Sequence, residues 1–256
     1  ASHGTQGVAF VAAWLLAELA RAEWLTGFPW GAAGYAHVDS ALAVLAPWLG
    51  VYGMGAVAAT LSVGLALAWG VRASLMRGGA MVMSLAVLLA VSQAWRSTDA
   101  THEVARVPLT LLQGNVPQDE KYQDQRFSAP LWYLDQIRQA GPGLTLAPET
   151  AFPLTTDQWP SDWWRALRSM GSDRAVLIGA PWQSGDSQGY RNSVLAFEAA
   201  DTSSTGTAPQ YRYDKHHLVP FGEFIPWGFN WFVQAMRIPL GEFERGASPQ
   251  PSWSWG

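Results

Sequence analysis

Glu149 is the first residue whose type and position suggest chemistry. It follows the apolar run LTLA through Pro148, so we expect it at the carboxyl end of a strand. The sheets of α/β proteins place ligands and catalytic groups at such ends. A carboxylate there could serve as a general base. An acid after a strand is also typical of a helix cap or a solvated surface, and its position alone leaves these roles open.

A second segment with possible chemistry, residues 213–224, reads YDKHHLVPFGEF and has no amphipathic period. Surface loops rarely interleave so many ionisable and large apolar groups, so we predict a structured site loop that includes Lys215 and Glu223. A metal site could use His216, His217 and Glu223. Adjacent histidines in an extended segment point to opposite sides, however, and no HExxH spacing occurs. We therefore expect no metal ligands, and no cofactor, since GxGxxG and GxxxxGK motifs are missing.

Composition excludes further classes of function. The 256 residues carry a net charge of -4, so the chain lacks the basic surface that binds nucleic acid through its phosphates. They contain no cysteine, which rules out disulfides, thiolate metal sites and a cysteine nucleophile among them.

Charged residues are distributed unevenly along the chain. None occurs between Asp39 and Arg72, and none between Arg77 and Arg96. A helix needs about 20 apolar residues to cross a bilayer core of about 30 Å. We therefore predict a transmembrane helical domain over residues 1–96 with about three spans. The predicted spans cover residues 7–17, 51–71 and 80–95.

Aromatic residues and loop charge indicate how these spans would lie. Five tryptophans sit near the ends of apolar runs, where indole rings settle at the membrane interface. These are Trp24, Trp30, Trp48, Trp69 and Trp95. The loop at 72–79 holds two arginines and no acid, which predicts a cytoplasmic position and places the chain after residue 96 on the periplasmic side. Residues 25–35 (LTGFPWGAAGY) would then form a lipid-facing outer loop or a tight turn packed between helices.

After a polar linker at residues 97–106, the pattern of residues 107–256 changes to apolar strands that alternate with helices. This alternation favours an α/β layered domain. Residues 107–113 resemble a buried strand, and residues 200–210 a solvated hairpin or loop. The other predicted strands are 144–147, 175–180 and 193–197, and the predicted helices are 126–140 and 159–170.

Four motifs resemble those of the bacterial apolipoprotein N-acyltransferases. They are TGFPW (26–30), LLQGNVPQ (111–118), LAPETAFP (146–153) and YDKHHLVPFGEFIP (213–226). The resemblance implies transmembrane helices followed by a periplasmic nitrilase-like domain, an αββα sandwich. It also implies a bacterial inner-membrane enzyme that moves an acyl chain from a phospholipid to the N-terminal amine of a diacylglyceryl lipoprotein.

The same resemblance assigns roles to four residues. Glu149 corresponds to the general base, Lys215 to the lysine that stabilises the tetrahedral intermediate, and Glu223 to a second glutamate of the site. Trp30, in the TGFPW motif, is expected to bind substrate. These roles suit acyl transfer through a thioester, because a thiol needs a base and the developing oxyanion needs a donor.

The family's nucleophilic cysteine is not among these residues. We therefore expect an incomplete chain that contains only the N-terminal part of the catalytic domain and is inactive as written. Two other interpretations remain open: a nitrilase-type amidase with a membrane anchor, and a non-catalytic membrane binding or scaffold protein that has lost the nucleophile.

Overall fold

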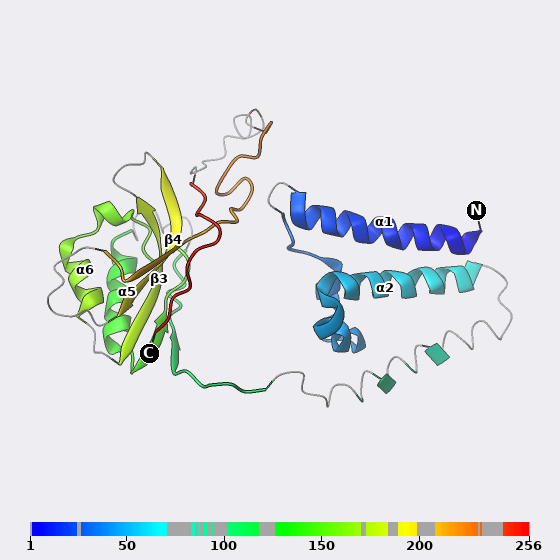
Figure 1. Ribbon diagram of the computed structural model, residues 1–256, viewed down its shortest axis with the longest axis horizontal. Helices are drawn as coiled ribbons and strands as arrows, with labels where there is room; N and C mark the ends of the chain where they lie inside the picture. Colours follow the sequence, from blue (N-terminus) through cyan, green and yellow to red (C-terminus); the bar gives the residue numbers. More distant parts are fainter. Residues whose placement is uncertain are drawn as a thin grey trace. The chain divides into compact units, whose positions relative to one another are not determined.

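The computed structural model contains two units, Ala1–Val104 and Ala105–Gly256. It describes residues 2–24, 27–70, 102–117, 126–169, 173–183, 189–198, 208–229 and 243–255, with isolated positions between 83 and 94 and at 231. Figure 1 shows both units. The predicted loop at 72–79 lies outside the described residues, as does most of the predicted span at 80–95.

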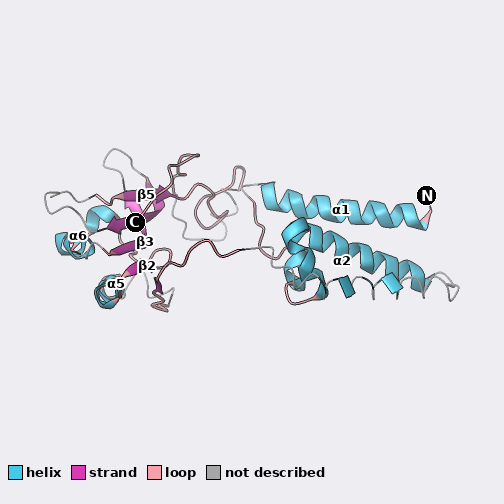
Figure 2. Cartoon of the chain, turned by 60° about the horizontal axis from the view of Figure 1, so that its bottom comes forward, coloured by secondary structure: helices cyan, strands magenta, loops and turns pink. Residues whose placement is uncertain are grey.

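The first unit is helical. Helix α1 (His3–Glu23) is capped by Ser2, whose hydroxyl oxygen accepts from the amide N–H of Thr5 at 3.3 Å. Two 3-10 helices follow, η2 (Ala33–His37) and η3 (Ala41–Leu45), and then α2 (Ala46–Gly70), which contains a non-helical residue at Gly50. Helices α1 and α2 lie side by side in Figures 1 and 2.

Small residues allow close contact within this helical unit. A Cβ at Gly7 would lie 2.7 Å from Val63 Cγ1, and one at Gly34 would lie 1.9 Å from the backbone oxygen of Val51. Glycine at these positions therefore lets α1 and η2 approach α2. Residues 25 and 26 lie outside the described part of the chain, so the outer loop and the tight turn at residues 25–35 both stay predictions.

One described helical stretch, Ala41–Leu67, is long and apolar enough to cross a membrane by length and composition. It overlaps the predicted span at 51–71. Helix α1 includes the predicted span at 7–17 and exposes several of its large apolar side chains. The count of three spans stays a prediction. Trp24, Trp30 and Trp48 are all well exposed, as interfacial residues would be.

The second unit contains a five-stranded mixed sheet in the order β1-β2-β3-β4-β5. Strands β1, β2 and β3 are parallel to one another, while β4 is antiparallel to β3 and β5 is antiparallel to β4. The strands are β1 (Leu109–Leu111), β2 (Gly143–Leu146), β3 (Arg174–Gln183), β4 (Tyr190–Glu198) and β5 (Tyr211–Asp214).

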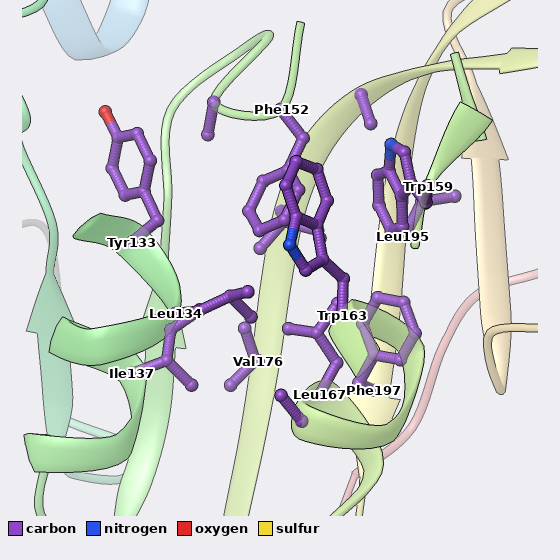
Figure 3. Close-up of a cluster of buried hydrophobic side chains, with 14 of the residues drawn as sticks. Tyr133, Leu134, Ile137, Phe152, Trp159, Trp163, Leu167, Val176, Leu195 and Phe197 are labelled. Carbon is purple, nitrogen blue, oxygen red and sulfur yellow. The ribbon is translucent and has the colours of Figure 1, made fainter. Parts of the chain in front are cut away.

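Two helices cover one face of this sheet (Figure 2). They are α5 (Ser128–Gln139) and α6 (Ser161–Arg168), preceded by the short η4 (Thr156–Gln158). Their apolar sides pack on Val176, Ile178, Leu195 and Phe197. Figure 3 shows Phe152 within this core, and its ring lies 4.9 Å from that of Trp159 and 5.5 Å from that of Trp163 between centroids.

Most predicted elements of this unit are confirmed, with shifted ends. The predicted helices at 126–140 and 159–170 are α5 and α6, and the predicted strands at 144–147, 175–180 and 193–197 are β2, β3 and β4. Strand β5 was not predicted. Residues 199–207, most of the predicted loop at 200–210, lie outside the described part of the chain.

The predicted strand at 107–113 is confirmed as the shorter β1, but the prediction that it is buried was wrong. Strand β1 is short and lies at the edge of the sheet, where Leu109 is 52% exposed and Leu111 is 69% exposed. An apolar run shows that a strand favours burial, but it does not show which layer covers it.

The face of the sheet opposite the helices is apolar. Because side chains alternate along a strand, the registers between strands place one set of residues on this face, away from α5 and α6. Its large apolar side chains are Leu109, Leu111, Leu144, Leu146, Leu177, Val194, Tyr211 and Tyr213. At the β5 edge, Tyr211 stacks on Trp253 with ring centroids 6.4 Å apart, so residues near the end of the described chain cover part of this region.

Candidate active site

Glu149 lies in a tight turn directly after β2. The turn is closed by the Ala151 N–H, which donates to the oxygen of Pro148 at 3.1 Å, and Thr150 has a positive φ of 53°. Gly179 of β3 lies against this turn: a Cβ there would be 2.7 Å from Glu149 Cα. The missing side chain at Gly179 therefore allows the turn to place Glu149 at the end of the sheet.

Lys215 follows β5 directly. Its backbone N–H donates to the oxygen of Asn192 at 2.8 Å, and its oxygen accepts from the Gly246 N–H at 3.0 Å. The ammonium Nζ lies 3.1 Å from Glu149 Oε1 and 2.9 Å from Glu223 Oε1. One ammonium group thus contacts two carboxylates that are distant from each other in the sequence.

Glu223 is the buried member of this cluster. Its Oε2 accepts from the backbone N–H of Val219 at 2.8 Å, and its own N–H donates to the oxygen of Val219 at 2.9 Å. Its backbone oxygen accepts from the N–H of Phe243 at 2.9 Å. Glu223 therefore has a fixed position, whereas the side chain of Glu149 is largely open to solvent.

Asn192, on β4, joins the two carboxylates. Its Nδ2 donates to Glu223 Oε1 at 2.7 Å and also to Glu149 Oε1. It is buried, so its amide hydrogens have to be satisfied inside the protein. We did not predict Asn192 from the sequence. The only available signal was an amide at the start of an apolar strand, RNSVLAF, which is also typical of a solvated strand end.

The carboxylates determine the charge state of Lys215. Burial lowers the pKa of its ammonium, but the hydrogen bonds and charges of Glu223 and Glu149 outweigh burial, so the pKa lies above its usual range. Lys215 is therefore a cation at neutral pH. A fixed cation beside a solvent-accessible carboxylate can stabilise a developing negative charge while the carboxylate accepts a proton.

A small cavity of about 180 Å³ adjoins Glu149. It is lined by residues 113–116, by the turn at 148–151, and by Tyr133 of α5. The Tyr133 hydroxyl accepts from the Gly114 N–H at 3.2 Å, and burial raises the pKa of this phenol although that hydrogen bond opposes the change. Asn115 has a positive φ of 47°. Asn adopts this left-handed region readily, whereas the β-branched Thr150 does so rarely, and such unusual backbone conformations cluster at functional sites.

The structure brings three of the four predicted site residues together: Glu149, Lys215 and Glu223. Trp30 belongs to the other unit. The functional roles of all four residues remain predictions. The expectation that His216 and His217 point apart was wrong, because their ring centroids lie 5.0 Å apart. In the described part of the chain, no group of three or more His, Cys, Asp or Glu side chains could hold a metal.

The fold and the site define an α/β protein with an acid–base cluster at its strand ends, preceded by an apolar helical unit. Residues 4–64 match the model of the apolipoprotein N-acyltransferase N-terminal domain. The chain is 44% identical over 261 residues to the apolipoprotein N-acyltransferase of Verminephrobacter eiseniae, with 96% of this chain and 47% of that protein covered.

Other relatives carry the same name. The apolipoprotein N-acyltransferase of Ralstonia nicotianae is 40% identical over 258 residues, which cover 98% of this chain and 46% of that protein. That of Neisseria meningitidis serogroup A is 33% identical over 245 residues, with 93% and 48% covered. Nearly the whole of this chain is therefore similar to proteins that bear the name apolipoprotein N-acyltransferase. The chain spans about half the length of the curated relatives that it matches.

Proposed function

We propose that the full protein containing these residues is an acyltransferase of the bacterial inner membrane. It moves an acyl chain from a phospholipid to the N-terminal amine of a diacylglyceryl lipoprotein, with its site on the periplasmic side. The observation that carries this proposal is the contact of Lys215 Nζ with both Glu149 and Glu223, in a chain whose relatives bear the name of this reaction.

In the first step, Glu149 accepts the proton of a cysteine thiol, and the thiolate attacks the ester carbonyl of the phospholipid. The 256 residues contain no cysteine, so the thiol is not one of them. Lys215 donates a hydrogen bond to the oxyanion of the tetrahedral intermediate. The carbon–oxygen bond then breaks, Glu149 returns the proton to the leaving lysophospholipid, and the acyl chain remains as a thioester.

In the second step, the lipoprotein amine attacks the thioester carbonyl. A nitrogen–carbon bond forms, Glu149 accepts a proton from the amine, and the sulfur leaves and is protonated again. The same carboxylate and ammonium therefore serve both steps. Glu223 keeps Lys215 in place, because its own position is fixed by the Val219 N–H.

We also propose that the α/β unit is part of a nitrilase-like αββα sandwich. Two features support this architecture: α5 and α6 cover one face of the sheet, and the opposite face exposes Leu109, Leu111 and Val194. An apolar sheet face is stable only when another layer covers it. A second sheet would bury these side chains.

The test is acyl transfer by the full-length protein in phospholipid vesicles. The acceptor is a diacylglyceryl-cysteine peptide, and mass spectrometry detects the gain of one acyl chain. Lys215→Met and Glu149→Gln should each lower the rate by about 100-fold or more, because each removes a group that acts in the transition state. Arg165→Gln, which changes an exposed ion pair on α6, is the control and should keep the rate. Transfer that survives in both site variants would refute the proposal.

A further inference from the structure

The guanidinium of Arg21 attaches the segment that follows α1 to that helix. Arg21 Nη1 donates to the backbone oxygen of Phe28 at 2.8 Å and to that of Trp30 at 2.9 Å. The backbone oxygen of Arg21 accepts from the Phe28 N–H at 2.8 Å. Arg21 thus holds residues 28–30 through both its side chain and its main chain.

Glu18, one turn earlier on α1, completes this attachment. Its Oε1 accepts from Arg21 Nη2 at 3.0 Å, and its Oε2 accepts from the Ala33 N–H at 3.0 Å. Ala33 is the first residue of η2. The two charged side chains therefore fix both the middle and the end of the segment 27–33.

The backbone of this segment has little freedom to move elsewhere. Gly27 has a φ of 83°, and a Cβ there would lie 1.9 Å from the backbone oxygen of Ala22. Ala32, at the other end, is buried. The segment is consequently held at its start by close packing, at its centre by Arg21 and at its end by Glu18.

The burial of this ion pair differs from that of a surface pair with the same spacing. The side chains of Glu18 and Arg21 are 16% and 33% exposed, whereas those of Asp162 and Arg165 are 78% and 73% exposed. An exposed pair contributes little to stability. A shielded pair whose carboxylate and guanidinium also bond the backbone determines a local conformation.

What the segment presents to its surroundings is a pair of aromatic rings. Phe28 is 48% exposed and Trp30 is 67% exposed, and their ring centroids lie 5.4 Å apart. Most of the energy of a buried ring comes from its apolar area, so two neighbouring exposed rings are unfavourable in water. At the interface of a bilayer, such rings contact the headgroup and glycerol region of lipids.

We propose that Glu18 and Arg21 are positioning residues that hold Phe28 and Trp30 against the headgroup and glycerol region of the phospholipid donor. The lipid-donor part of this inference rests on the proposed function, while the attachment of the segment does not. Neither charged side chain needs to touch the reacting atoms. Their effect on the reaction passes through the placement of the two rings.

The experiment combines a spectroscopic and a kinetic measurement on the full-length protein. The protein is labelled with 5-fluorotryptophan, and the 19F resonance of Trp30 is assigned by its loss in Trp30→Phe. The protein is reconstituted in vesicles of ether-linked lipid, in which the mole fraction of ester phospholipid is varied. The variants are Arg21→Gln and Glu18→Gln, and Arg165→Gln is the matched control.

We expect Arg21→Gln to shift and broaden the Trp30 resonance, and to raise the KM for phospholipid about tenfold with kcat changed less than about twofold. Glu18→Gln keeps an acceptor for the Ala33 N–H and should give a smaller change in the same direction. If Arg21→Gln does not fold, Glu18→Gln carries the test. A Trp30 resonance and a KM that match those of Arg165→Gln would overturn the inference.

Two mixed outcomes separate this inference from the proposed function. If the Trp30 resonance moves in Arg21→Gln but the wild-type protein transfers no acyl chain, the proposed function fails and the attachment of the segment stands. If transfer is normal and depends on Glu149, but neither the resonance nor the KM responds to Arg21→Gln, the positioning role fails and the proposed function stands.

Discussion

At the candidate site, the side chains of Lys215 and Asn192 each donate hydrogen bonds to both Glu149 and Glu223. Two carboxylates that share neighbours repel each other unless donors lie between them. The ammonium supplies charge, and the amide supplies hydrogen bonds without charge. The site therefore depends on donors from two strands, β4 and the end of β5.

Asn192→Asp tests the amide. The substitution keeps the shape of the side chain, removes both amide hydrogens and adds a third carboxylate, so acyl transfer should fall about 100-fold and unfolding should require less denaturant. The control is Gln139→Glu, since the Gln139 amide donates to Asp135 at 2.7 Å on an exposed helix surface. A transfer rate in Asn192→Asp equal to that of the control would show that the amide has no role.

Glu223→Gln tests the charge state of Lys215. The carboxylates raise the pKa of Lys215, so the ammonium is stabilised at pH values below its unfolded pKa, and this stabilisation is lost as the pH rises through the folded pKa. Removing one carboxylate should move the alkaline limb of kcat/KM to lower pH, whereas Gln139→Glu should leave it in place. An unmoved alkaline limb in Glu223→Gln would mean that Glu223 does not act on Lys215.

At the scale of elements, the turn after β2 depends on its neighbour β3. Gly179 is the residue of β3 that faces this turn, and the backbone of the turn leaves no room for a side chain at this position. The sequence alone does not explain why residue 179 is a glycine, because a glycine within AVLIGA is equally typical of a weak or bulged strand. Packing between two strands that are distant in sequence explains this residue.

Gly179→Ala should displace Glu149. Its Cβ would lie 2.7 Å from Glu149 Cα and from the oxygen of Pro148, so we expect a loss of about 1–3 kcal/mol in the free energy of unfolding and a large loss of transfer activity. Gly141→Ala is the control, since a Cβ there meets nothing within 4 Å. Both are measured by urea unfolding and by the transfer assay. Equal behaviour of the two variants would contradict the packing argument.

The aromatic core beneath the same turn should also be essential for the stability of the α/β unit. Phe152 is fully buried among the rings of Tyr133, Trp159 and Trp163. Phe152→Ala should lower the free energy of unfolding by about 3–5 kcal/mol. Phe127→Ala, at a residue that is 46% exposed, should lower it far less. A small loss at Phe152 would mean that the core relaxes around the gap.

At the scale of the whole molecule, the pattern of apolar residues in the sequence predicts helices and strands better than it predicts which strands and layers they contact. Period and composition were sufficient for α5, α6 and four of the five described strands, and for Glu149 at the end of β2. Strand β5 was missed because YRYD has no apolar alternation; it is defined by pairing with β4. The exposure of β1 could not be predicted either, since it depends on which layers cover the sheet.

The site was predicted only in part, for a related reason. Glu149, Lys215 and Glu223 were identified through motifs, whereas their contacts arise from strand order and register. Asn192 reaches both carboxylates because Ser193 pairs with Asp214, which places it beside Lys215. Such a register is a property of long-range pairing, and no local pattern in RNSVLAF indicates it.

If Glu149, Lys215 and Glu223 act as proposed, they promote the formation of an acyl-thioester on a cysteine of the full-length protein. The most direct measurement uses full-length protein and a phospholipid with an alkyne-tagged acyl chain, and reads the protein-bound tag before and after neutral hydroxylamine. We predict a hydroxylamine-sensitive tag on the wild-type protein and on Arg165→Gln, and almost none on Glu149→Gln or Lys215→Met. A tag of equal intensity on the two site variants, or one that resists hydroxylamine, would contradict the proposed roles.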